Sequence, residues 1–127
     1  MIARDLMTPN PTTVTPQASI AEAWELMREL EIRHVPVVQD GALVGMLSDR
    51  DLARLDIARM LALPIVNVMS SDVIAVEPES ELSEIVDLLI ENRVGALPVV
   101  HADTREVVGI VSYIDVLRAV QDRLEEE

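Results

Sequence analysis

Short hydrophobic blocks separated by turn residues run along this chain, and their spacing predicts the element that each one forms. A short β-prone segment, Thr12 to Thr15, is closed by Pro16. A hydroxyl at Ser19 and a carboxylate at Glu22 then match a capping box at the start of a helix. Behind this cap, apolar residues recur at helical spacing and predict one buried face, made of Ile20, Ala23, Trp24, Met27 and Leu30.

The next two apolar blocks predict a β-hairpin. Residues 35–38 are apolar without polar alternation, which is typical of a strand buried on both faces. Asp40 and Gly41 form a turn signal, and residues 43–47 return as the partner strand. A second helix is expected to start at Ser48. The order strand, helix, strand, strand, helix predicts an α+β fold whose helices pack on a sheet, as in α/β-type layers.

This pattern occurs twice, with a period of about half the chain. Pro36-Val37-Val38 recurs 62 residues later as Pro98-Val99-Val100, and two extra residues near Asp103 then lengthen the shift to 64. A unit of about 60 residues is too small to bury a good core alone. We therefore expect two β-α-β-β-α repeats, residues 1–62 and 63–127, docked rigidly on each other about a pseudo-two-fold axis.

The second repeat is expected to contain the same elements as the first. Its hairpin strands are predicted over residues 97–100 and 107–111, between a first strand at 73–76 and a last helix from about Ser112. The helix that precedes the hairpin has apolar residues at helical spacing, which predict an inward face at Leu82, Ile85, Val86 and Leu89.

Composition and charge exclude several classes of function. The net charge of −13 argues against nucleic acid or an anionic membrane as a partner, because a basic face supplies most of the affinity for either. The chain has no cysteine, which excludes disulfides and thiol chemistry. No apolar run is long enough to span a membrane, and the N-terminus lacks the apolar core of a secretory signal. We therefore expect a cytoplasmic protein.

One short motif occurs in both repeats where a strand is expected to meet a helix: Gly, two apolar residues, Ser, two residues, Asp. It runs from Gly45 to Asp51 in the first repeat and from Gly109 to Asp115 in the second. One interpretation is a helix cap, with the glycine marking a close approach of backbones. Aspartate is shorter than the glutamate or glutamine that completes a capping box, so we expect it to reach back less well.

The other interpretation of this motif is a nucleotide site. A serine hydroxyl at the start of a helix, at Ser48 and Ser112, offers a donor to phosphate. A carboxylate three residues later, at Asp51 and Asp115, can accept both hydroxyls of a ribose. The glycine would let a ligand lie against bare backbone. Chance helix caps do not explain why all three features recur in both repeats.

Basic side chains near the first motif are candidates for holding a phosphate. Arg33 and Arg50 could grip an anion. Each could instead be solvated or paired with Asp49 or Glu31, and the sequence leaves these alternatives open. His34 could donate to phosphate, could act as a titrating sensor or could cap a strand. The histidines and carboxylates show no metal-ligand spacing, and neither motif serine has a matching histidine to activate it. We therefore expect no metal site, no catalytic residue and no enzyme activity.

The chain resembles a tandem pair of CBS domains, the module named after cystathionine β-synthase. The resemblance covers nearly the whole chain and rests on the two motifs and on three segments, Asp5-Leu6-Met7-Thr8-Pro9, Arg33-His34-Val35-Pro36-Val37-Val38 and Gly95-Ala96-Leu97-Pro98-Val99-Val100. It implies two clefts that bind an adenosine compound, which is AMP, ADP, ATP or S-adenosylmethionine. It implies no obligatory cofactor.

The resemblance also implies which residues line each cleft. In the family the aspartate holds the ribose, the serine meets phosphate, and adenine lies between the first strand and the segment before the Pro-Val pair. One cleft would use the backbone near Thr13 with Arg33, His34, Val35, Ser48 and Asp51, and Arg50 joins it as a phosphate candidate. The other would use the backbone near Ile74 with Gly95, Ala96, Leu97, Ser112 and Asp115. The two clefts therefore differ in charge.

The expected function is regulatory: the module would sense an adenine nucleotide and report it through a homodimer or an unidentified protein partner. Apolar faces on the last helix of each repeat predict that the chain dimerises into a flat disc of four repeats. These faces contain Ala53, Leu55, Ile57, Ala58, Val116, Leu117, Ala119 and Val120. The alternative is a scaffold that uses the fold only for association, with empty clefts.

Overall fold

A computed structural model describes residues 1–126, without the side chain of Ile57. It divides into two compact units, one of Thr12–Val73 and one that joins Met1–Pro11 to Ile74–Glu127. Each unit combines helices with antiparallel strands, which confirms the predicted mixture of helix and sheet. In the described part of the chain, no helix has the length and apolar character needed to cross a membrane.

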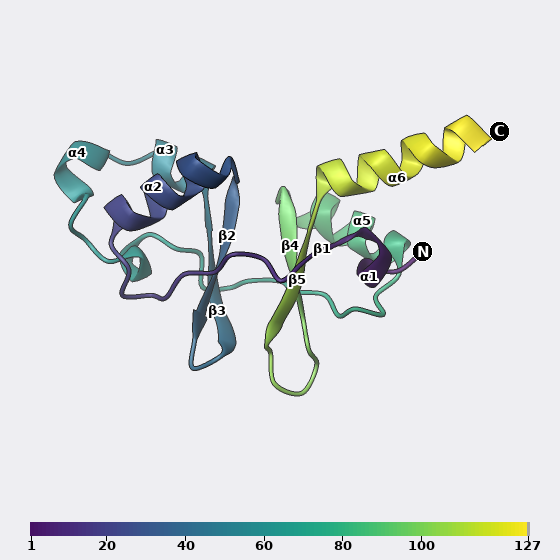
Figure 1. The fold of residues 1–127 in the computed structure, drawn as a ribbon, viewed down its shortest axis with the longest axis horizontal. Helices are drawn as coiled ribbons and strands as arrows, with labels where there is room; N and C mark the ends of the chain where they lie inside the picture. The colour runs from purple at the N-terminus through teal and green to yellow at the C-terminus, as the bar shows by residue number, and fades with distance from the viewer. Residues whose placement is uncertain (127) are drawn as a thin grey trace. The chain divides into compact units, whose positions relative to one another are not determined.

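The unit of residues 12–73 is a β-hairpin with a helix packed beside it (Figure 1). Its strands β2 (His34–Gln39) and β3 (Ala42–Ser48) pair antiparallel. Asp40 and Gly41 form the predicted turn, with positive φ angles of 52° and 82°. The helices of this unit are α2 (Ile20–Leu30), α3 (Asp49–Ala53), α4 (Ile57–Met60) and the short 3₁₀ helix η1 (Ile65–Asn67).

Helix α2 packs most of its predicted inward face into the core of this unit. Ser19 caps the helix, because its side chain accepts a hydrogen bond of 3.1 Å from the Glu22 N–H. The buried core consists of Ile20, Ala23, Met27, Val35, Val37, Leu47, Leu52 and Ile65. Trp24 is only half-buried, and the prediction for Leu30 is wrong, since it is 47% exposed. Leu30 ends the helix, almost one turn beyond the last buried position, Met27.

The strand predicted at residues 12–15 shortens to a single parallel bridge at Val14. The Val14 N–H donates to the Pro36 carbonyl at 3.1 Å, and the Val38 N–H donates to the Val14 carbonyl at 2.8 Å. The ladder cannot continue, because the next donor on this side would belong to Pro16, which has no N–H. The sequence placed the segment correctly beside the hairpin but overestimated its regular length.

The other unit is built on a three-stranded sheet with the order β1-β5-β4. Its strands are β1 (Thr8–Pro9), β4 (Ala96–Val100) and β5 (Val107–Ser112). Its helices are α1 (Ala3–Leu6), α5 (Leu82–Asn92) and α6 (Tyr113–Glu126). The strand predicted at residues 73–76 is again one parallel bridge, at Val76, and Pro78 ends it for the same reason as Pro16. Ile85 and Leu89 of α5 are buried as predicted.

The N-terminal segment completes this second unit, an arrangement that the sequence pattern does not predict. Strand β1 pairs antiparallel with β5, so that Thr8 lies opposite Ile110. Ala3 is fully buried in the core, and its N–H donates to the Ser80 carbonyl at 2.8 Å. The spatial units therefore divide the chain differently from the repeats of the sequence, whose boundary at residue 62 remains a prediction.

Candidate functional site

The first motif lies where β3 ends and α3 begins, and its serine and aspartate hold each other. The Ser48 N–H donates to Asp51 Oδ2 at 2.9 Å, and the Asp51 N–H donates to Ser48 Oγ at 3.1 Å. These two bonds make a complete capping box. The expectation that aspartate reaches back poorly is therefore wrong. The extended backbone of Ser48 (φ −119°, ψ 160°) brings its N–H beside the first helical turn, where a short side chain suffices.

The second motif has the same geometry where β5 ends and α6 begins. The Ser112 N–H donates to Asp115 Oδ2 at 2.8 Å, and the Asp115 N–H donates to Ser112 Oγ at 3.2 Å. The Ser112 hydroxyl also lies 3.0 Å from Asp115 Oδ2. Among the described residues, Oδ1 of Asp51 and Oδ1 of Asp115 accept no hydrogen bond. Each motif therefore keeps one carboxylate oxygen for another partner, although the other oxygen serves as a helix cap.

The glycine of each motif faces a methionine and offers no bare backbone to a ligand. A methyl group on Gly45 would lie 2.6 Å from the sulfur of Met69, and a methyl group on Gly109 would overlap the side chain of Met7. Both glycines are buried. The expectation that these glycines admit a ligand is therefore wrong, because a methionine of the same unit already fills that space. From the sequence, Met7 and Met69 are expected only to fill the core; their contacts with the two glycines are not predicted.

The strand pairing brings the other predicted residues of the first site to the motif. His34 of β2 lies directly opposite Ser48 of β3, and the Asp49 N–H donates to the Arg33 carbonyl at 2.9 Å. Thr13 precedes the bridge at Val14, so its backbone runs along the other side of β2. The residues predicted for one cleft thus come from one unit, and they lie on neighbouring segments at the end of its hairpin.

Charged groups of both signs surround His34. Burial lowers the pKa of His34 below its ordinary value of 6.5. The carboxylates of Asp49 and Asp51 act in the opposite direction, and the guanidinium groups of Arg33 and Arg50 add to the lowering. Both arginines are exposed, and neither forms an ion pair with a described residue. Of the interpretations that the sequence left open for them, the ion pair with Asp49 or Glu31 is not formed.

The equivalent surroundings of the second motif carry much less charge. Ala96 lies opposite Ser112 where the first site has His34, and the Tyr113 N–H donates to the Gly95 carbonyl at 3.0 Å. Leu97, like Val35 in the first unit, is buried in the core, so it can offer only its backbone to a ligand. Ile74 is 37% exposed. The predicted difference in charge between the two sites is present in the structure.

The chemistry of these groups suits a polar ligand. Free carboxylate oxygens can accept hydroxyl donors, and in the first site a histidine and two guanidinium groups stand near the motif to meet an anion. In the described chain, no histidine is hydrogen-bonded to Ser48 or Ser112. Clusters of three or more potential metal ligands are also absent from the described residues.

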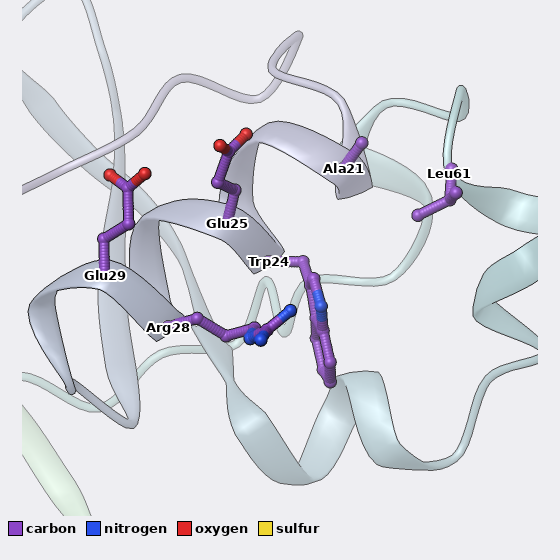
Figure 2. Close-up of a pocket in the computed structure, with 6 residues that line it drawn as sticks. All are labelled: Ala21, Trp24, Glu25, Arg28, Glu29 and Leu61. Atoms are coloured by element: carbon purple, nitrogen blue, oxygen red, sulfur yellow. The ribbon is translucent and has the colours of Figure 1, made fainter.

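A separate groove lies between α2 and the segment that follows α4, and none of its lining residues belongs to the first motif (Figure 2). Its volume is about 510 Å³, and it is lined by Ala21, Trp24, Glu25, Arg28, Glu29 and Leu61. Figure 2 shows Trp24 and Leu61 on either side of the groove and the Arg28 side chain extended toward Trp24. Trp24 was predicted to lie in the core. Helical spacing gives the same signal for residues at the edge of a buried face and at its centre, and Trp24 lies at the edge.

Comparison with protein families matches one profile, described as "CBS domain", to residues 3–58 and 65–122. Among curated proteins, the chain is 36% identical over 114 residues to the CBS domain-containing protein YhcV of Bacillus subtilis. The match covers 88% of this chain and 80% of YhcV. Homoserine O-acetyltransferase of Methanocorpusculum labreanum is 35% identical over 113 residues, but the match spans only 23% of that enzyme.

Two solved structures with bound ligands resemble this chain over almost its whole length. The structure of CBSX2 in complex with AMP has a TM-score of 0.85 and 32% identity, and the match covers 95% of this chain and 96% of that one. The CBS domain pair of protein MJ0100, in complex with 5′-methylthioadenosine and S-adenosyl-L-methionine, has a TM-score of 0.88 and 27% identity. That match covers 97% of this chain and 98% of the other.

Proposed function

Because this chain belongs to the CBS domain family, we propose that it is a regulatory module that binds an adenosine compound at each serine–aspartate motif. The module senses the ligand and performs no reaction. In each site the free aspartate oxygen accepts the ribose hydroxyls, and the serine lies beside the phosphate. In the first site, the phosphate meets Arg33, His34 and Arg50.

The observation that carries this proposal is the free carboxylate oxygen beside each motif. In Asp51 and Asp115, Oδ2 accepts the hydrogen bond of the helix cap, and Oδ1 has no partner among the described residues. Both aspartates are half-buried, but neither Oδ1 is a buried atom without a partner, so each can be reached from solvent. A charged acceptor that is open in this way can bind a ligand that brings hydroxyl groups. A ribose supplies two neighbouring hydroxyls. The AMP complex of CBSX2 and the adenosine-derived ligands of MJ0100 support the same chemistry.

A second candidate function is a scaffold whose sites stay empty. It is favoured by the reciprocal bonds between serine and aspartate, which satisfy the motif as a helix cap with no ligand present. The scaffold interpretation leaves the charged groups around His34 unexplained, because a helix cap requires neither Arg33 nor Arg50. We therefore rank it second.

We also propose that the module acts as a homodimer through α6. Four large apolar residues recur along one side of this helix and are between 42% and 64% exposed: Tyr113, Leu117, Val120 and Leu124. An exposed stripe of this kind marks an association surface, and two-fold pairs are the commonest closed assembly. Val116 and Ala119 do not belong to it, because each is only 8% exposed in the core of its own unit. In the first repeat, Ile57 lies outside the described side chains.

A thermal-shift panel tests the proposed function. The panel contains AMP, ADP, ATP, S-adenosylmethionine and adenosine, with GTP as the control for a purine triphosphate. A ligand at ~100 times its Kd stabilises a one-site protein by roughly 2.7 kcal/mol, so at least one adenosine compound should raise the melting temperature by several degrees. If every compound behaves like buffer, the scaffold is the better account.

A further inference from the structure

Met7 and Met69 occupy equivalent places in the two units, each packed against the glycine that opens a motif. A methyl group on Gly109 would overlap Cγ and Sδ of Met7 and would lie 3.1 Å from its Cβ. A methyl group on Gly45 would lie 2.6 Å from Sδ of Met69. Both methionines are half-buried and both glycines are buried. Each methionine therefore rests directly on the strand that leads to the serine of the motif.

In this packing, a methionine from one sequence repeat contacts the glycine of the other repeat. Met7 lies in Met1–Pro11, which forms one compact unit with residues 74–127. Its N–H donates to the Ala3 carbonyl at 2.9 Å, and the residues that follow form β1, which pairs with β5. The methionine from the start of the first repeat therefore supports the motif of the second repeat.

In the unit of residues 12–73 the roles of the repeats are exchanged, because the methionine comes from the second repeat and the glycine from the first. Met69 comes from the segment that opens the second repeat, and it lies against Gly45 of the first motif. The next residue, Ser70, exchanges two hydrogen bonds of 2.9 Å with Met46, one residue past that glycine. Each motif thus packs against the segment that opens the other repeat in the chain.

We propose that Met7 is a positioning residue for the second site and Met69 for the first, so that the N-terminal segment supports the second site alone. The argument is steric. Gly109 has no side chain to separate β5 from Met7, so the methionine sets how closely β5 can approach β1. Three residues later on the same strand, the Ser112 N–H must reach Oδ2 of Asp115. A shift of β5 moves that bond and the free carboxylate oxygen with it.

Amide hydrogen exchange tests this proposal without any ligand. The Ser112 and Ser48 N–H groups are matched probes, since each donates to an aspartate of its own motif. Met7→Ala should speed exchange at Ser112 by about tenfold and leave Ser48 unchanged, because local opening of one unit need not open the other. Met69→Ala should do the reverse. Equal effects at both probes, or no effect at either, would overturn the proposal.

Ligand binding gives a second readout, and this part rests on the proposed function. Asp51→Asn disables the first site, so AMP titration then reports the second. In that background Met7→Ala should weaken AMP about tenfold, whereas Met69→Ala should not. Met7→Leu should restore the affinity, because it refills the space with a side chain of similar volume. If the parent binds no adenosine compound, the proposed function fails while the exchange experiment still decides the role of Met7.

A double variant that adds a methyl group at the glycine and shortens the methionine distinguishes positioning from a general loss of stability. Gly109→Ala should speed exchange at Ser112, and adding Met7→Ala should restore it, because it removes Sδ and Cγ, the two atoms nearest to the new methyl group, and keeps only the Cβ of that side chain at 3.1 Å. Gly45→Ala should not be rescued by Met69→Ala, since the Ser70 carbonyl oxygen lies 2.9 Å from the new methyl group and cannot be trimmed. Rescue at Gly109 without rescue at Gly45 is the expected result. Failure of Met7→Ala to rescue Gly109→Ala would show that the methionine does not set the position of β5.

Discussion

His34 lies directly across the β2–β3 ladder from Ser48, which places a titratable ring beside the serine of the first motif. In the other unit, Ala96 takes this place opposite Ser112. The two sites therefore share the serine and aspartate but differ in what stands next to them. The first site has Arg33, His34 and Arg50 beside the motif, and the equivalent positions of the second are the uncharged Gly95, Ala96 and Ile114.

The first prediction follows from this difference. With the second site disabled by Asp115→Asn, the first site should bind ATP more tightly than AMP, and its affinity should fall as salt is added. Arg33→Gly, His34→Ala and Arg50→Ile together give the first site the residues found at the equivalent positions of the second, Gly95, Ala96 and Ile114, and should remove this preference for charge. Calorimetry with adenosine, AMP and ATP measures the effect. Binding that ignores both phosphate number and salt in the unsubstituted first site would contradict the assignment.

A second prediction concerns pH and the stability of the ligand-free protein. Burial lowers the pKa of His34 in the folded state, so as pH falls below 6.5 the unfolded chain takes up this proton first. This contribution to stability is therefore complete above pH 6.5 and is lost as pH falls toward the folded-state pKa. His34→Gln should lose less stability than the parent between about pH 7.5 and about pH 5.5. Urea unfolding of both proteins at several pH values measures the difference, and parallel curves would contradict it.

A third prediction concerns assembly. Leu117→Ser together with Leu124→Ser should convert a dimer into a monomer, because both side chains belong to the exposed stripe on α6. Gln121→Ser is the matched control, since it places the same residue at an exposed position of the same helix. Light scattering at tens of micromolar protein measures the mass. A monomeric parent would defeat the proposed dimer, and a dimeric double variant would move the interface away from α6.

The sequence predicted the elements with a strong period better than the short ones. The helix over Ile20–Leu30 and both hairpins are present, because many residues of each contribute to its pattern. The segments at residues 12–15 and 73–76 form single bridges, because one backbone donor decides how far a ladder extends and a proline removes it. The spacing of hydrophobic residues carries no information about one missing N–H, so it does not predict where such a strand ends.

The structure brings together the residues that the sequence named for the first site, while their role in binding stays a prediction. His34, Ser48 and Asp51 fall together, since the register of one hairpin brings them to the same end. The places of Met7 and Met69 were missed, because the pairing of a two-residue strand with a distant partner leaves no local periodic signal. The repeat itself held one clue, since Met7 and Met69 occupy equivalent positions near the start of the two repeats, 62 residues apart.

The central claim is that both aspartates hold the ribose of an adenosine compound, and substitution by asparagine tests it directly. Asp51→Asn and Asp115→Asn keep a carbonyl oxygen that can accept the serine N–H, so the helix caps and the melting temperature should be nearly unchanged. Each removes a charged acceptor worth roughly 1.5–3 kcal/mol, so each site should lose about tenfold or more in affinity. Calorimetry with AMP should show two sites in the parent, one in each single variant and none in the double variant. A double variant that binds AMP as the parent does would contradict the account.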